Sequence, residues 1–344
     1  MSNKILEVED LSVEFATYGG NVKAVRGVSF AVNRGETLAI VGESGCGKSV
    51  TVQAIMGIIP MPPGKITGGT AKLNGQNILG LPPSAANRFR GVEIGMIFQD
   101  PMTSLNPTMT IGDQISETLM VHRGMSHSDA SKRAVELLDK TKIAEAAKRA
   151  KQYPFEFSGG MLQRAMIAQS LACNPSILIA DEPTTALDVT IQAQILELMA
   201  ELQRTEKMSI ILITHDLAVV ARMANQVAVM YAGQIVESGG VDDIFYRSSH
   251  PYTLGLKEAM PSNKNDGKKK LMPIQGSPPD LFHPPTGCGY FARCPYAMKV
   301  CEHHSPAEYH LTGSEAEHQS RCWLQHEGAP RHALLNQPRA EHRD

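Results

Sequence analysis

The residues from Gly42 to Ser49 have the types and the spacing needed to hold a phosphate group. They match the pattern G-x-x-x-x-G-K-[ST] and lie between an apolar run and a helical run. Glycines let the backbone curl until its N–H groups point at phosphate oxygens, and the positive end of the next helix faces the same anion. Lys48 would reach the β- and γ-phosphates, and the Ser49 hydroxyl would bind Mg²⁺. A plain glycine-rich turn is the alternative. We expect an ATP site made of Gly42, Glu43, Ser44, Gly45, Cys46, Gly47, Lys48, Ser49 and Val50.

Two carboxylates, Asp181 and Glu182, directly follow the apolar run Ile177–Ala180. The carboxyl end of a buried parallel strand is where α/β sheets place their ligands. We therefore expect Asp181 to hold the Mg²⁺ shell and Glu182 to polarise an attacking water, the role of a general base. The alternative is an ordinary strand end with two solvated acids.

A second anion-binding helix start is predicted at residues 157–164, where a serine and two glycines open a helical run. Such a helix start has N–H groups without intrahelical partners and a favourable dipole, so it can hold another phosphate. One chain with two such helix starts suggests two nucleotides held between two such domains.

These motifs together resemble the ABC ATPase family over roughly residues 5–260. The resemblance implies that Gln99 contacts Mg²⁺ and the attacking water and that His215 is the switch histidine. Glu182, His215 and Gln99 then form the catalytic set, and Ser49, Gln99 and Asp181 hold Mg²⁺.

The same resemblance assigns further residues to nucleotide binding. Tyr18 is the candidate for stacking on adenine, with Phe15 nearby as the alternative. The signature motif departs from the commonest family sequence at its first and fifth positions, Phe157 and Met161, but keeps its Ser-Gly-Gly centre. The signature and the D-loop imply contacts with the ATP of a partner subunit from Ser158, Gly159, Gly160, Met161 and Asp188.

Hydrophobic periodicity predicts the elements that position these residues. Strands are expected at Thr37–Val41, Ile94–Phe98, Ile177–Ala180 and Ser209–Ile213, and an Asn74-Gly75 hairpin is expected between Ala71–Leu73 and Asn77–Leu79. Residues 110–172 change to helical spacing, and strands and helices alternate after them. With the family resemblance, the predicted fold is α/β: a P-loop ABC ATPase domain with a mixed sheet core, an antiparallel β subdomain and an inserted helical subdomain.

The predicted domain order follows changes in composition. Residues 1–260 form the ATPase domain, with the helical subdomain at about 100–172. A polar linker at 262–270 begins a small, irregular, cysteine-rich C-terminal extension over 261–325, and residues 326–344 are predicted to be a disordered tail.

Composition excludes several classes of protein. The 344 residues carry 33 Lys+Arg and 35 Asp+Glu, a formal net charge of −2, which argues against a protein that coats nucleic acid. No apolar stretch is long enough to span a membrane, and the acidic N-terminal segment does not resemble a signal peptide. We therefore expect a cytoplasmic protein.

Four of the six cysteines, Cys288, Cys294, Cys301 and Cys322, lie close together in the sequence near its C-terminal end. In a reducing compartment such a group suggests a metal site before disulfides. Their gaps are wider than the C-x₂₋₄-C pairs of structural zinc sites and suit an iron–sulfur cluster held by four thiolates. Zinc and thiols without metal stay open as alternatives, and His303 and His304 are candidate substitute ligands.

The tail extends the resemblance to the ATPases of oligopeptide and dipeptide ABC importers. The matching segments are residues 250–253, 276–279 and 287–295, together with 156–164 and 181–190. The related ATPases carry a [4Fe–4S] cluster in this extension, which implies one here. The resemblance also implies a second, non-identical ATPase subunit, two membrane permease subunits and a peptide-binding protein as partners, with the chain peripheral to the cytoplasmic face of a bacterial inner membrane. Import of nickel or another small solute, and a soluble ATPase acting on nucleic acid or ribosomes, are the alternatives.

Overall fold

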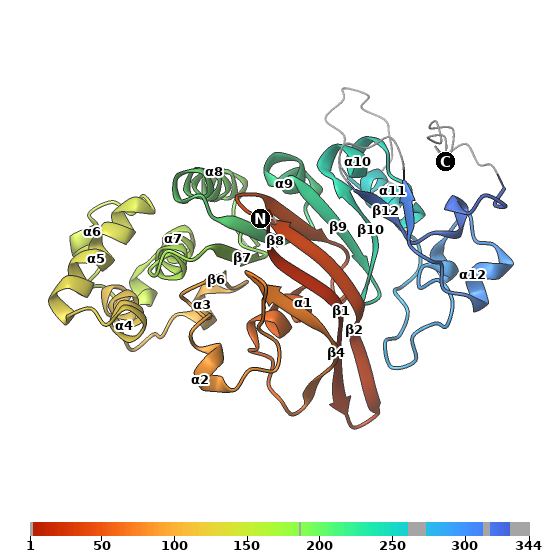
Figure 1. The fold of residues 1–344 in the computed structure, drawn as a ribbon. Helices are drawn as coiled ribbons and strands as arrows, with labels where there is room; N and C mark the ends of the chain where they lie inside the picture. Colours follow the sequence, from red (N-terminus) through yellow and green to blue (C-terminus); the bar gives the residue numbers. More distant parts are fainter. Residues whose placement is uncertain (1–2, 186, 261–272, 312–316, 331–344) are drawn as a thin grey trace. The chain divides into compact units, whose positions relative to one another are not determined.

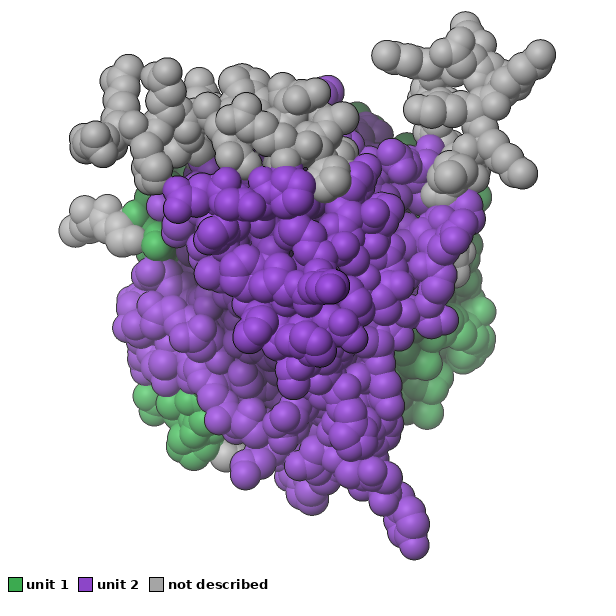
Figure 2. Space-filling view, turned by 90° about the vertical axis from the view of Figure 1, so that its right-hand side faces the viewer, with its two compact units in different colours: residues 1–5, 32–37, 78–213 green, residues 6–31, 38–77, 214–344 purple. Residues whose placement is uncertain are grey.

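The computed structural model describes residues 3–185, 187–260, 273–311 and 317–330 (Figure 1). The chain forms two compact units, each built from several segments (Figure 2). Unit 1 consists of residues 1–5, 32–37 and 78–213, and unit 2 of residues 6–31, 38–77 and 214–344. The predicted domain boundaries at residues 260 and 325 stay predictions, and the predicted linker at 262–270 and residues 331–344 of the predicted tail lie outside the described residues.

Three parallel strands form the sheet of unit 1, in the order β8-β7-β6. They are β6 (Ile94–Ile97), β7 (Ile177–Asp181) and β8 (Ser209–Thr214), and all their residues are buried. Strands buried on both faces have continuous apolar sequences, which is why the short apolar runs predicted them correctly.

The predicted inserted helices are also present in unit 1. The longer ones begin at side chains that cap them: the Thr110 hydroxyl accepts a hydrogen bond from Asp113 N, and Ser126 accepts one from Asp129 N. The helices of this unit are α2 (Pro83–Ala86), α3 (Pro101–Ser104), α4 (Ile111–Arg123), α5 (His127–Lys140), α6 (Ala146–Arg149), η1 (Pro154–Glu156), α7 (Gly159–Ser170) and α8 (Val189–Glu206).

Unit 2 contains an antiparallel sheet with the strand order β2-β1-β4-β5. These strands are β1 (Lys4–Thr17), β2 (Gly20–Asn33), β4 (Gly64–Leu73) and β5 (Gln76–Asn77). The predicted hairpin is confirmed: Leu73 pairs with Gln76, and Asn74 and Gly75 both have positive φ, as a type I′ turn requires.

A second, mixed sheet of unit 2 holds the phosphate-loop strand β3 (Thr37–Val41). Its strand β9 (Gln226–Tyr231) runs parallel to β3 and antiparallel to β10 (Gln234–Gly240). The helices of unit 2 are α1 (Lys48–Met56), α9 (Leu217–Met223), α10 (Val241–Tyr246), α11 (Pro251–Glu258), η2 (Phe291–Arg293), α12 (Lys299–His303) and η3 (Trp323–Gln325).

The C-terminal extension is less irregular than predicted. Its strand β12 (His318–Ser320) pairs antiparallel with β10, and β11 (Tyr309–Leu311) pairs with β12. Three residues are too few to show an alternation of polar and apolar side chains, so the sequence carried no readable strand signal here. Among the described residues, no helix has the length and apolarity needed to cross a membrane.

Candidate functional site

The phosphate loop of unit 2 connects β3 to α1 and depends on two glycines. A Cβ at Gly42 would lie 2.1 Å from the Met230 carbonyl oxygen, and a Cβ at Gly47 would lie 2.4 Å from that of Ala24. Gly47 also has φ 103°, in the left-handed region that favours glycine. The close backbone approach of β9 and β2 therefore excludes any side chain at either position.

Lys48 is folded back over this loop. Its Nζ donates hydrogen bonds to the carbonyl oxygens of Gly42 (2.8 Å) and Glu43 (3.0 Å), and the residue is 5% exposed. The ammonium group also lies 4.0 Å from Cys46 Sγ, and none of these three partners is an anion, so it is well placed to meet one at the mouth of the loop. The Tyr18 ring, also in unit 2, is fully exposed in the turn between β1 and β2.

In unit 1 the carboxyl end of β7 brings together two of the three predicted catalytic residues, Glu182 and Gln99. Asp181 is buried as the last residue of the strand. Glu182 follows it with φ 47°, a left-handed backbone that is strained for a residue with a side chain. The Glu182 carboxylate accepts hydrogen bonds from Gln99 Nε2 (3.2 Å) and Thr185 Oγ1 (2.9 Å). Gln99 and Glu182 are 83 positions apart in sequence, and the fold places them in direct contact.

The signature motif of unit 1 opens helix α7. Ser158 is its N-cap, and its Oγ accepts a hydrogen bond from Met161 N at 3.4 Å. A Cβ at Gly160 would lie 2.9 Å from Ile191 Cγ2 of α8, so this glycine permits close helix packing. Asp188 caps α8 by accepting from Ile191 N at 2.9 Å. His215 belongs to unit 2, where it is an exposed residue directly after β8.

The four tail cysteines lie around one cavity of unit 2, together with His250, Tyr290 and Leu324. None of the chain's six cysteines forms a disulfide. Burial raises the pKa of Cys288 and Cys322, and it raises the pKa of Cys294 to about 11. Within the part of the chain that the structure describes, no group of three or more His, Cys, Asp or Glu side chains is arranged to hold a metal ion.

One buried polar atom beside this cavity lacks a partner. His250 Nδ1 accepts a hydrogen bond from Tyr252 N at 3.1 Å, so the neutral imidazole carries its proton on Nε2. Burial lowers the pKa of His250 to about 3, which keeps the ring neutral. Its Nε2 has no hydrogen-bond partner among the described residues. In the sequence, His250 belongs to a segment that matches the importer ATPases, and no local pattern marks it as a site residue.

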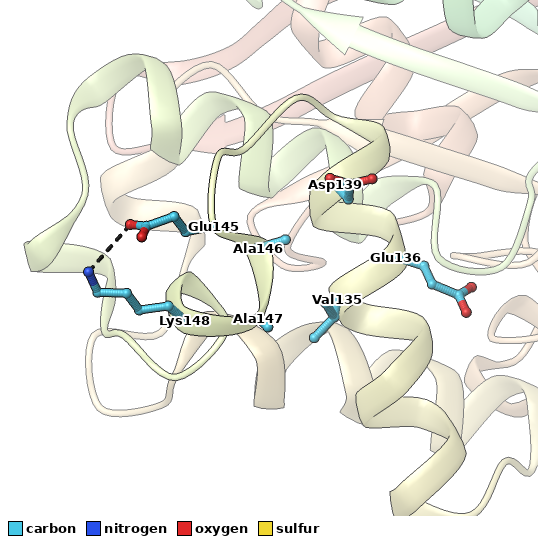
Figure 3. Close-up of a pocket in the computed structure, with 7 residues that line it drawn as sticks. All are labelled: Val135, Glu136, Asp139, Glu145, Ala146, Ala147 and Lys148. Atoms are coloured by element: carbon cyan, nitrogen blue, oxygen red, sulfur yellow. Dashed lines mark hydrogen bonds and ion pairs between the residues drawn. The ribbon is translucent and has the colours of Figure 1, made fainter.

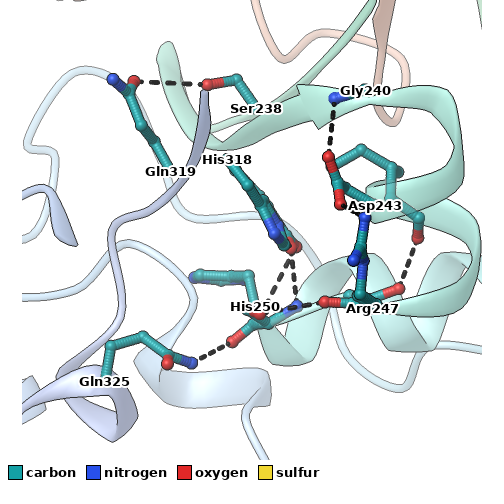
Figure 4. Close-up of polar contacts among 12 residues, drawn as sticks. Ser238, Gly240, Asp243, Arg247, His250, His318, Gln319 and Gln325 are labelled. Atoms are coloured by element: carbon teal, nitrogen blue, oxygen red, sulfur yellow. Dashed lines mark hydrogen bonds and ion pairs between the residues drawn. The ribbon is translucent and has the colours of Figure 1, made fainter. Parts of the chain in front are cut away.

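A buried carboxylate anchors this region. Glu237 of β10 accepts from the backbone N–H groups of Ser249 (2.6 Å) and His250 (3.0 Å) and lies 2.9 Å from His318 Nε2 of β12. His250 and His318, which both belong to this network, are labelled in Figure 4. The network therefore ties the extension to β10 and to the start of α11. A separate surface pocket of unit 1, lined by α5 and α6 residues such as Asp139 and Lys148, contains none of the predicted site residues (Figure 3).

Comparisons with known proteins agree with these motifs. The family model described as ABC transporter matches residues 25–185, and the model described as oligopeptide/dipeptide transporter, C-terminal region, matches residues 236–301. The oligopeptide transport ATP-binding protein OppD of Bacillus subtilis (strain 168) is 56% identical over 95% of this chain and 91% of its own length. The dipeptide transport ATP-binding protein DppD of the same strain is 53% identical over 97% of this chain and 98% of its own length.

Among solved structures, the dimeric MJ0796, titled a bacterial ABC transporter cassette, matches with a TM-score of 0.62 and 28% identity. The match covers 69% of this chain and 98% of the MJ0796 chain. The fold and the phosphate loop thus define an ABC transporter ATPase. More narrowly, the chain belongs to the family of ATP-binding subunits of oligopeptide/dipeptide ABC importers, whose ATP hydrolysis is coupled to peptide import.

Proposed function

We propose that this chain binds ATP in the loop from Gly42 to Val50 and uses Glu182 as the base that orients and deprotonates the attacking water. The contact of Gln99 and Thr185 with the Glu182 carboxylate carries this proposal, because these two donors leave the carboxylate one defined orientation. The strained φ of Glu182 is of the kind that persists where function needs a fixed geometry.

The remaining assignments rest on the family. Tyr18 stacks on adenine, and His215 is the switch histidine of the catalytic set. Ser158, Gly159, Gly160, Met161 and Asp188 act on the ATP of a partner subunit, as the N–H groups at the start of α7 allow. The partners are a second, non-identical ATPase subunit, two membrane permease subunits and, indirectly, a peptide-binding protein. The chain would act at the cytoplasmic face of a bacterial inner membrane.

Mg²⁺ is assigned to Ser49, Gln99 and Asp181. Hydroxyl, amide and carboxylate oxygens are the hard donors that this ion prefers, and Asp181 places its carboxylate at a buried strand end. When bound, the ion supplies charge neutralisation on the phosphate oxygens. The protein's own residues hold the triphosphate through Lys48 and the loop N–H groups and move a proton to Glu182.

We also propose that Cys288, Cys294, Cys301 and Cys322 hold a [4Fe–4S] cluster. All four line one cavity, and their burial disfavours ionised thiols unless cations are bound beside them. The unpartnered His250 Nε2–H at the same cavity would meet an acceptor on such a group. A single ion needs its ligands gathered around one point, whereas each thiolate of a cluster binds a different iron, so wider spacing suits the cluster. A cluster bound there would supply metal–thiolate bonds that stabilise a segment with few helices and strands.

Peptide uptake by the assembled transporter tests the proposed function. The full chain, combined with its partner ATPase and permease subunits in liposomes, should take up a labelled peptide when ATP and the binding protein are supplied. Lys48→Ala removes the charge aimed at the phosphates and should abolish both ATP binding and uptake. Nickel uptake without peptide uptake would favour the small-solute alternative, and unchanged ATP affinity in Lys48→Ala would contradict the phosphate-loop assignment.

A further inference from the structure

The C-terminal extension is bonded to the nucleotide-binding half of its own unit. Within unit 2, the Leu281 carbonyl accepts a hydrogen bond from Lys23 N of β2 at 2.9 Å, and the Pro285 carbonyl accepts one from Arg26 Nη2 at 3.4 Å. The rings of Tyr231, Tyr252 and Tyr290 pack together, with centroids 4.5–5.4 Å apart. The extension is therefore part of the structure that surrounds the phosphate loop.

Arg293, the residue just before Cys294, reaches the phosphate loop itself. Its Nη1 and Nη2 donate to the two carboxylate oxygens of Glu43 at 2.6 and 2.9 Å, which is a two-pronged ion pair. The remaining N–H groups donate to Tyr231 Oη and to the carbonyls of Gln275 and Ile274 at 3.2, 2.9 and 3.3 Å. The side chain of Arg293 is 5% exposed, so this fully bonded guanidinium is fixed in place.

Glu43 is held by its backbone as well as by its side chain. Its N–H donates to Tyr252 Oη at 2.9 Å, and its carbonyl accepts from Lys48 Nζ at 3.0 Å. The negative charge of the Glu43 carboxylate would repel the triphosphate that this loop is proposed to bind. Arg293 neutralises this carboxylate and fixes its direction at the same time.

We propose that Arg293 is a positioning residue for the phosphate loop, so that the folded C-terminal extension sets the affinity of the ATP site through Glu43. The inference rests on the proposed ATP site. It does not depend on which metal, if any, the cysteines hold, because the ion pair is made by protein atoms alone.

A double-mutant cycle in the purified transporter complex tests the proposal, with MgATP titrated and its dissociation constant measured. Arg293→Gln leaves the Glu43 charge unpaired in the loop and should weaken ATP binding about tenfold or more. Adding Glu43→Gln to this variant removes the unpaired charge and should restore affinity to within about threefold of Glu43→Gln alone. Arg321→Gln breaks another Arg–Glu ion pair of the extension, with Glu308, and should leave ATP affinity unchanged.

The cycle separates positioning from general stability. A merely structural Arg293 would lower the melting temperature without any recovery of affinity in the double variant. Native affinity in Arg293→Gln, or additive losses in the double variant, would overturn the proposal. If Arg293→Gln does not fold, Arg293→Lys is the second variant, because lysine keeps the positive charge but cannot form the two-pronged ion pair. This variant should bind ATP about threefold more weakly, and native affinity would overturn the proposal. Failure of the native complex to bind ATP would instead refute the proposed function.

Discussion

At the scale of single residues, the carboxyl end of β7 brings together the side chains that we propose to act in catalysis. Glu182 combines a left-handed backbone with two hydrogen-bond donors on one carboxylate oxygen, from Gln99 and Thr185. Both donors approach the same oxygen of the carboxylate that we propose as the base. Its replacement should therefore affect the chemical step more than the binding of ATP.

Glu182→Gln is expected to keep ATP binding and to lower the hydrolysis rate by about 10²–10⁴, which corresponds to roughly 3–5 kcal/mol of barrier. The amide keeps the shape of the side chain but cannot take the proton of the water. Single-turnover hydrolysis and size-exclusion chromatography with ATP are the measurements, and an ATP-loaded dimer of ATPase subunits should accumulate. Turnover near the native rate would mean that Glu182 is not the base.

At the scale of elements, the N-terminal residues of helices stabilise unit 1, and one of these N-termini is also proposed to bind phosphate. Ser158 caps α7 and Ser126 caps α5, each by accepting a backbone hydrogen bond three residues further on. Only the first of these helix starts belongs to the predicted signature motif. The two serines therefore form a matched pair for separating capping from phosphate binding.

Ser158→Ala and Ser126→Ala should each destabilise unit 1 by about 1 kcal/mol, the usual effect of losing an N-cap. Only Ser158→Ala should also lower ATP hydrolysis by the assembled complex, because only that hydroxyl is assigned to a phosphate. Urea unfolding and steady-state ATPase rates measure the two effects. Equal ATPase activity in both variants would remove Ser158 from the site.

The buried His250 at the start of α11 makes the stability of its region depend on pH. Burial lowers the pKa of His250 to about 3, whereas the unfolded chain has the ordinary value near 6.5. Below pH 6.5 the unfolded state therefore binds the proton first, and stability falls as the pH falls toward 3. Tyr290 lies near the ring, at 5.9 Å between ring centroids, Tyr252 N donates to its Nδ1, and the four tail cysteines line the same cavity. Glu237 accepts from His250 N.

Between pH 6.5 and 5 this histidine should cost about 1–2 kcal/mol of unfolding free energy. His250→Gln does not titrate in this range, so its pH profile should be flatter by that amount. Urea unfolding at several pH values gives both profiles. Parallel profiles of the two proteins would show that His250 does not contribute.

At the scale of the whole molecule, the C-terminal extension is an integral part of unit 2. It adds β12 to the edge of β10, closes the Glu237 network through His318, and reaches the phosphate loop through Arg293. A change in the cysteine cavity should therefore lower the stability of unit 2 outside the extension as well.

Metal removal tests the cysteine site at this scale. Protein purified without oxygen should be brown and contain about four irons per chain, as expected for a [4Fe–4S] cluster held by four thiolates. Cys294→Ser should lose most of the iron and lower the melting temperature, because the metal–thiolate bonds contribute to folding. Cys173→Ser, at a buried cysteine in unit 1, is the control and should keep the iron. A colourless protein that contains zinc, or no metal, would refute the cluster and leave the ATPase assignment intact.

The sequence alone determined the features that are local in the chain. The strands β3, β7 and β8 and the Asn74-Gly75 turn were correctly predicted, because contiguous residues specify their apolar runs and turn chemistry. The family resemblance extended these local predictions to a function, that of a peptide importer ATPase. It also implied that Gln99 and Glu182 belong to one catalytic set, although nothing in the spacing of these two residues indicates their contact.

Only the tertiary structure decided which distant residues meet. Arg293 and Glu43 are 250 positions apart, and neither has a local pattern that marks an ion pair. The strands β11 and β12 are too short to show periodicity, and they exist because β10 offers an edge with which to pair. His250 looks like an ordinary polar residue until the fold buries it with an unpartnered Nε2. Contacts of this kind depend on how the chain returns on itself, and that path is set by packing of the whole unit rather than by any segment.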